Sequence, residues 1–129
     1  MDDTINSSQR DITLLYSEAS LYSRIKVAQA HVKLDNAEMK EIIDQYINDT
    51  PVMFKQLNTA WIKSDYENII LYAHSIVGVA RILKLDEVSE YAKALEDKAK
   101  ERKRSEKKVL KLLNDHHHAS LKTLCQLFS

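Results

Sequence analysis

The clearest helix-start signal in the chain opens the segment of residues 64–83, SDYENIILYAHSIVGVARIL. It opens with Ser64 and, three residues later, Glu67, a pair typical of a capping box at the start of a helix. Apolar residues then recur at spacings of four and three, as expected for the buried face of a helix. The pattern predicts a helix that runs to about residue 83 and packs one face against a core. That face consists of Ile69, Ala73, Ile76, Ala80 and Leu83.

Glycine and proline occur only once each, as Gly78 and Pro51, in a chain of 129 residues. Sheets and βα units need repeated turn residues, so this composition argues against both. Enzymes that hold phosphates on glycine-rich loops are excluded for the same reason. A chain of this length can form one compact domain with its own core. We expect that domain to be helical.

Four further segments show a helical pattern. One helix is expected to start at residues 35–38 and to end at residues 49–51, where proline interrupts it. The next begins at Pro51, since proline suits the first turn of a helix. Another starts at Asp86, and the last carries the apolar residues of segment 109–128. Short connections favour antiparallel neighbours, so the predicted fold is all-α, an up-down antiparallel four-helix bundle with one or more additional N-terminal helices.

Residues 1–34 carry a weaker pattern. Their apolar residues could line one side of a helix, but serine and β-branched residues weaken it. We expect either an extra helix laid against the bundle or a linker from a larger protein. The helical-bundle domain is expected to span residues 35–129. The apolar residues in question are Ile12, Leu15, Tyr16, Ala19 and Tyr22.

Charge and targeting patterns exclude several other classes of protein. The 19 basic and 19 acidic residues balance, so no overall field favours nucleic acid or a membrane surface. The basic run from Lys98 to Lys108 is interleaved with acidic residues and has no aromatic residue, which favours a solvated helix end over a nucleic-acid site. No apolar run is long enough to span a membrane, and no signal-peptide pattern is present. We therefore expect a cytoplasmic protein without direct membrane insertion.

The cysteine and histidine residues do not suggest a metal site. Cys125 is the single cysteine, which excludes an internal disulfide and a multi-cysteine metal site. His116, His117 and His118 are consecutive, so on a helix they point in different directions and cannot chelate one ion well. His31 is expected to be an ordinary surface residue. No metal or other cofactor is expected in this chain.

His74 and Gly78 stand out on the helix predicted for residues 64–83. A step of about 100° per residue turns His74 away from the apolar face. Gly78 lies one turn later, on the same side as His74, although glycine inside a helix costs about 1 kcal/mol relative to alanine. A helix that keeps glycine there leaves room for a bulky partner beside an outward-facing histidine.

The stretch from Tyr72 to Gly78, YAHSIVG, resembles the phosphorylation motif of bacterial histidine-containing phosphotransfer (HPt) domains. That motif has an alanine, the histidine, a hydrophobic residue two positions later and a glycine four positions later. Residues 49–51 resemble the family's break between its first two helices, and residues 64–67 its polar turn before the histidine helix. Residues 94–96, Ala-Leu-Glu, resemble its Leu-Glu element. The resemblance covers about residues 36–128.

Two positions depart from the family pattern. Val77 stands where the family usually has lysine, and Lys84 stands where it often has a second glycine. The lysine would normally help to hold the phosphoryl oxygens, and Arg81 and Lys84 are the candidates to replace it. The departures bear on the stability and rate of transfer more than on the identity of the acceptor, His74.

The resemblance implies that His74 accepts a phosphoryl group from a receiver-domain aspartate of a hybrid sensor kinase and passes it to the receiver of a response regulator. An exposed imidazole is largely neutral near pH 7 and is a good nucleophile. The receiver would bring Mg²⁺. Nothing resembles an ATP site, so the chain is not expected to autophosphorylate. The docking surface is expected to include Ile70, Leu71 and Val77 beside Arg81, unless these apolar residues merely widen the core stripe.

Other functions stay open at this point. A module of the same fold could dock receivers without being phosphorylated, as the missing lysine at Val77 would fit. An unrelated helical adaptor, in which His74 is incidental, is the third alternative. Under the carrier hypothesis the chain is either free-standing or the C-terminal module of a hybrid sensor kinase, and one exposed histidine requires only a monomer.

Overall fold

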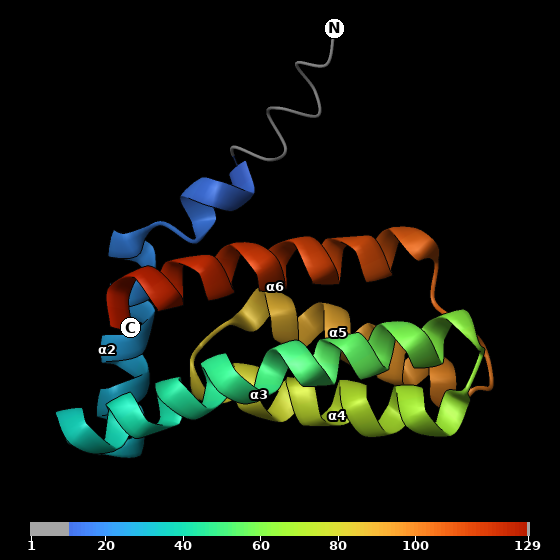
Figure 1. The fold of residues 1–129 in the computed structure, drawn as a ribbon, viewed down its shortest axis with the longest axis horizontal. Coiled ribbons are helices and arrows are strands. Elements are labelled where there is room, and N and C mark those ends of the chain that lie inside the picture. Colours follow the sequence, from blue (N-terminus) through green and yellow to red (C-terminus); the bar gives the residue numbers. More distant parts are fainter. Residues whose placement is uncertain (1–10, 129) are drawn as a thin grey trace, which may run out of the picture.

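The computed structural model describes residues 11–128, and within them the chain is helical without any strand (Figure 1). Residues 11–15 form a short helical stretch. The longer helices are α2 (Glu18–Val32), α3 (Asn36–Ile62), α4 (Tyr66–Ile82), α5 (Asp86–Lys100) and α6 (Lys107–Phe128). The prediction of an all-α fold is confirmed.

Helices α3 to α6 form a four-helix bundle, as predicted. They run along the long axis in Figure 1, and α2 crosses one end. Each bundle helix packs against two others, in the ring α3, α4, α5, α6. The connections are short, residues 63–65, 83–85 and 101–106, so successive helices are antiparallel. No helix among residues 11–128 is long and apolar enough to cross a membrane.

The core confirms the apolar face read from the sequence of α4. Ile69, Ala73, Ile76, Ala80 and Leu83 are all at most 1% exposed. They belong to one cluster of buried residues to which α2, α3, α5 and α6 also contribute. Because this face is buried along the full length of α4, the opposite face is left to solvent.

One prediction was wrong: α3 does not end at Pro51 but continues through it. Proline removes one backbone hydrogen bond and costs about 3 kcal/mol inside a helix. The buried side of α3 nevertheless continues across it at four-residue steps through Tyr46, Thr50 and Phe54. Burial of large apolar side chains contributes about 1.5–3 kcal/mol each. A continuous helix that buries the apolar residues on both sides of Pro51 therefore offsets the cost of the proline, which itself is exposed.

Apart from the start at Pro51, the predicted starts of α3, α4 and α5 hold to within two residues, although the caps of α4 and α5 differ from the predicted ones. Asp35 caps α3 in a capping box with Glu38, as the sequence predicts. The cap of α4 is Asp65, whose side chain accepts from the backbone N–H of Asn68. Ser64, the expected cap, instead adopts a left-handed conformation with φ 54°.

The start of α5 also differs from the predicted one in its cap. Asp86 is the first residue of the helix rather than its cap. Leu85 takes the cap position without a side-chain hydrogen bond, and its own side chain is fully buried. Anchoring Leu85 in the core fixes where the chain enters α5, so tertiary packing replaces the missing side-chain cap.

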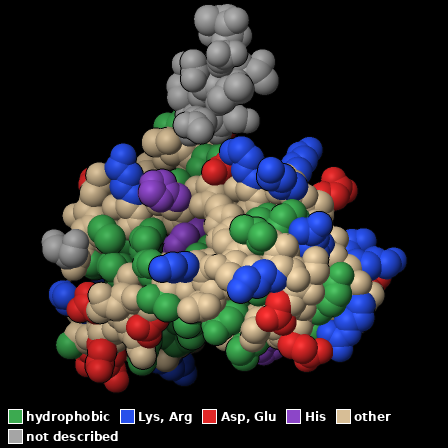
Figure 2. Space-filling model, turned by 45° about the vertical axis from the view of Figure 1, so that its right-hand side comes forward, with side chains coloured by type: hydrophobic (Ala, Val, Ile, Leu, Met, Phe, Trp, Pro, Cys, Tyr) green, Lys and Arg blue, Asp and Glu red, His purple; other side chains and the backbone are tan. Residues whose placement is uncertain are grey.

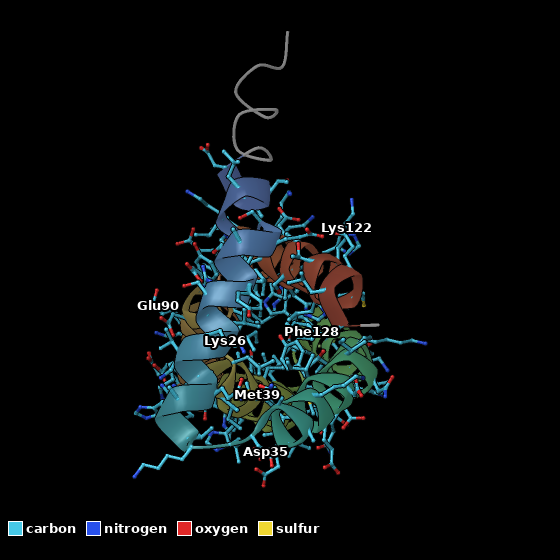
Figure 3. The ribbon with its side chains drawn as sticks, turned by 90° about the vertical axis from the view of Figure 1, so that its left-hand side faces the viewer. Lys26, Asp35, Met39, Glu90, Lys122 and Phe128 are labelled. Carbon is cyan, nitrogen blue, oxygen red and sulfur yellow. The ribbon has the colours of Figure 1, made fainter. Side chains whose placement is uncertain are left out.

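The segment before residue 35, left open as helix or linker, forms α2 in its second half. Leu21, Ile25 and Ala28 place one face of α2 in the same core cluster as the bundle. Figure 3 looks at this end of the molecule and shows α2 beside Met39 near the start of α3 and Phe128 at the end of α6. Residues 1–10 lie outside the described residues, and a domain boundary at residue 35 stays a prediction.

Candidate functional site

His74 lies near the middle of α4 on the side that faces away from the core. Its side chain is 76% exposed, whereas its sequence neighbour Ala73 is completely buried. The 100° step between consecutive residues of a helix produces this contrast. The imidazole is therefore held on a rigid helix and is open to a partner.

One nitrogen of the His74 ring is held by a buried carboxylate on the neighbouring helix. Glu96 of α5 has a side chain only 4% exposed, and its Oε2 lies 2.9 Å from Nδ1 of His74. An ionised carboxylate can only accept hydrogen bonds, so Nδ1 is the donor and carries the proton. In the neutral ring the lone pair then lies on Nε2.

The buried charge of Glu96 is balanced by two lysines from its own helix. Lys100 Nζ lies 3.3 Å from Oε2, the same oxygen that binds His74, and Lys93 Nζ lies 3.9 Å from Oε1. Lys93 also donates to Asp97 at 2.9 Å, and this hydrogen bond raises the pKa of Lys93. The two ammonium groups thus compensate the buried carboxylate, and its Oε2 accepts from His74.

Gly78 is exposed one turn beyond His74, and no contact among the described residues requires it. A Cβ built at this position would meet no atom within 4 Å, and its φ is not positive. Packing and backbone conformation would therefore both accept alanine. The sequence hypothesis that the glycine leaves room for an external partner agrees with this open space.

The other predicted site residues on α4 lie at different depths. Leu71 is 54% exposed, Ile70 is half-buried and Arg81 is exposed. Val77 is only 4% exposed and belongs to the core cluster, so the expectation that its side chain would line the docking surface is corrected. The apolar face of α4 therefore widens at Val77.

Lys84 follows the end of α4 in the left-handed conformation, with φ 59°. A residue in this conformation commonly ends a helix, and glycine adopts it at the lowest cost. The position thus has the backbone shape that favours the family's second glycine, with lysine in its place. The carbonyl oxygen of Lys84 accepts a hydrogen bond from Arg24 of α2 at 3.0 Å, which helps to fix this turn.

Glu96, Lys93 and Lys100 were not predicted as site residues. A signal for Glu96 existed in the sequence, because it lies four residues after Ala92 and three before Ala99, both on the buried face of α5. A carboxylate at such a position needs a partner. The identity of that partner depends on how α4 and α5 are aligned, which only the structure shows.

The remaining histidines have structural surroundings. His116 and His117 are buried, whereas His118 and His31 are exposed. Nδ1 of His116 lies 2.8 Å from the hydroxyl of Tyr16. The ring of His117 stacks on Phe54 with centroids 3.6 Å apart. Burial lowers the pKa of His117 to about 4. Within residues 11–128 no three His, Cys, Asp or Glu side chains are arranged to hold a metal ion.

The basic run near residues 98–108 covers the end of α5, the loop that follows it and the first residues of α6. Its lysines and arginines are exposed, and Arg102 and Lys103 pair with Glu67 and Glu101. Figure 2, in which this end of the bundle is turned forward, shows basic side chains interspersed with acidic and hydrophobic ones. The arrangement agrees with a solvated helix end.

Comparison with known protein families supports the resemblance. A model of the Hpt domain family matches residues 41–126, a span that includes most of α3 and nearly all of α6 and has His74 and Glu96 inside it. Neither the comparison with curated proteins nor that with solved structures gave a match. The matched span covers well over half of the chain, and the helical bundle is the fold expected for it. The chain therefore belongs to the Hpt domain family.

Proposed function

We propose that this chain is a phosphoryl carrier of a multistep two-component phosphorelay and that His74 is its phosphoacceptor. The observation that carries the proposal is the pairing of a 76% exposed imidazole with the buried carboxylate of Glu96. The carboxylate holds the proton on Nδ1 and leaves Nε2 as the nucleophile. This arrangement requires no cavity, so the reacting partner can bring its own pocket to the histidine.

In the proposed reaction Nε2 attacks the phosphorus of an aspartyl phosphate on a receiver domain, in line with the leaving oxygen. The P–N bond forms as the P–O bond to the aspartate breaks, and the aspartate leaves as a carboxylate. The ring becomes positively charged while Nδ1 keeps its proton, and Glu96 lies 2.9 Å away to stabilise that charge. Transfer to a second receiver is the same exchange in reverse. Mg²⁺ belongs to the receiver in this scheme.

Docking would use the exposed face of α4 on both sides of His74. Leu71 lies one turn before His74, and Ile82, which is 41% exposed, lies two turns after it. Between these residues Gly78 adds no side chain, and the position of its missing Cβ is open space. A surface with apolar contacts and a basic edge, here Arg81, suits a transient partner. The proposal therefore assigns the receiver to this face, with Val77 in the core rather than in the interface.

The test is transfer from receiver domains phosphorylated on their aspartate by acetyl phosphate, followed by removal of the small donor. The wild-type chain should take up acid-labile, base-stable label, and His74→Gln should not. His118→Gln is the matched control, because His118 is also an exposed helical histidine. Its label should equal that of the wild type.

One observation favours a second function, a receiver-docking adaptor that is not phosphorylated. Val77 replaces the lysine usual in the family, and a histidine that lost its phosphoryl-holding cation would carry phosphate poorly. Under this alternative the wild-type chain would bind receivers with the same affinity as His74→Gln and neither would become labelled. A cytoplasmic location, a monomeric state and a hybrid sensor kinase as donor stay predictions.

A further inference from the structure

The absence of lysine at position 77 raises the question of which cation faces a phosphoryl group on His74. A phosphoryl group bound to a histidine carries two negative charges near neutral pH. Here it would lie close to Glu96, a carboxylate that is already buried and negative. Without a nearby cation, repulsion between these charges would weaken the P–N linkage and disfavour the phosphorylated state.

The cations on α4 itself are poorly placed. Arg81 is seven residues after His74 and Lys84 is ten, which corresponds to about 10 Å and about 15 Å along the helix axis. Side chains on a helix lean toward its N-terminus, so the ring of His74 and the side chain of Arg81 lean in the same direction and keep the separation set by their positions on α4. Lys84 also lies past the end of α4, where the backbone turns toward α5.

Lys100 lies on the side toward which His74 leans. Because α4 and α5 are antiparallel, the C-terminal end of α5 lies beside the N-terminal half of α4, as the ion pair between Arg102 and Glu67 also shows. Lys100 and His74 share a single atom, Oε2 of Glu96, at 3.3 Å and 2.9 Å. The ammonium group of Lys100 and the ring of His74 are thus separated only by the carboxylate oxygen that both contact.

Lys93, the other lysine near Glu96, is less available. It lies 3.9 Å from the opposite oxygen, Oε1, and donates to Asp97 at 2.9 Å. Among residues 11–128, Lys100 has Glu96 as its single ionic partner, and 53% of its side chain is exposed, so it can rotate toward a new anion. An ammonium group has three donors, which allows Lys100 to contact a phosphoryl oxygen and Glu96 together.

We propose that Lys100 is a positioning residue that supplies the positive charge for the phosphoryl group on Nε2 of His74, in place of the lysine that Val77 replaces. The inference rests on the proposed function. In the unmodified chain Lys100 neutralises Glu96. After transfer, the same ammonium group bridges the carboxylate and the phosphoryl oxygens, so that a residue of α5 does what the family's lysine does from the histidine helix.

The experiment measures the lifetime of phosphohistidine on the full chain after the receiver has been removed. Lys100→Ala should lose its label about three to ten times faster than the wild type, the range expected for one partly exposed charge-assisted contact. Lys100→Arg, which keeps the charge, should restore most of the lifetime. Lys98→Ala is the matched control, since Lys98 is an exposed lysine of α5 with no contact to Glu96.

The outcomes separate this inference from the function on which it rests. Equal label lifetimes for the wild type, Lys100→Ala and Lys100→Gln would overturn the role of Lys100 and leave His74 as carrier. A shorter lifetime for Lys93→Ala than for Lys100→Ala would overturn it as well and assign the charge to Lys93. A wild-type chain that takes no label would overturn the proposed function itself. Lys100→Gln keeps the test valid if Lys100→Ala unfolds.

Discussion

Replacing Gly78 should make the protein more stable and worse at transfer, because the glycine serves a partner rather than the fold. A methyl group at this position meets no atom within 4 Å, so no packing penalty opposes it. Alanine is favoured over glycine inside a helix by about 1 kcal/mol. Gly78→Ala is therefore expected to raise the free energy of unfolding by about 1 kcal/mol, which corresponds to about 4 °C in Tm for a domain of this size.

The transfer rate should move in the opposite direction. Gly78 follows His74 by one turn on the exposed face, so each added atom stands where the receiver has to approach. Gly78→Ala should slow the initial rate of labelling several-fold, and Gly78→Leu should slow it further while remaining a good helix former. Urea unfolding measures the first effect, and time-resolved label uptake from a phosphorylated receiver measures the second.

A matched control separates helix propensity from docking. Ala94 is an exposed residue in the middle of α5, and Ala94→Gly should lower stability by about 1 kcal/mol without changing the transfer rate. A Gly78→Ala variant that is less stable than the wild type would contradict this expectation, because the added methyl group would then clash with the protein instead of lying in open space. The role of Gly78 in docking is refuted if Gly78→Ala and Gly78→Leu transfer at the wild-type rate, because the open space would then have no use in docking.

Two further predictions concern buried groups. Glu96→Gln removes the negative charge beside His74, so it should slow label uptake about tenfold while His74 remains the labelled residue; an unchanged rate would show that the carboxylate does not activate the ring. Burial lowers the pKa of His117 to about 4, below the value of about 6.5 in an unfolded chain. The unfolded state then binds the extra proton first, so the free energy of unfolding should fall by up to about 3 kcal/mol from pH 6.5 to pH 4. His117→Phe, which preserves the stacking on Phe54, should remove this part of the pH dependence in urea titrations, and an identical pH profile would contradict it.

The features that could be predicted from the sequence are those that depend on residues close together in the chain. The apolar face of α4 and the capping box at Asp35 depend on residues within one or two turns of each other, and both are present. Pro51 predicted a helix break from local sequence, but α3 continues through it because of tertiary packing. The stripe through Tyr46 and Phe54 gains more from burial as one helix than a break at proline would save.

The partner of His74 could not be read from the sequence in the same way. Glu96 follows His74 by 22 residues and contacts it because α4 and α5 pack at one particular alignment. Periodicity predicts which side of each helix is buried but does not fix how far one helix is shifted along the other. The sequence indicates that a carboxylate, Glu96, lies on the buried face of α5. Only the structure, through the alignment of α4 and α5, shows that its partner is His74.

The placement of Val77 gives a physical reason for the missing lysine. Position 77 is buried in the core, so a lysine there would have to extend its stem along the core before its ammonium group reached the surface. Lys100 brings an ammonium group to the carboxylate of Glu96 from the exposed side of α5. Because Lys100 balances Glu96 from this side, position 77 can be an apolar residue that adds to the core. In this chain the positive charge is then supplied by Lys100 of α5 rather than by a lysine at position 77 of α4. The acceptor His74 and its buried partner Glu96 keep their roles.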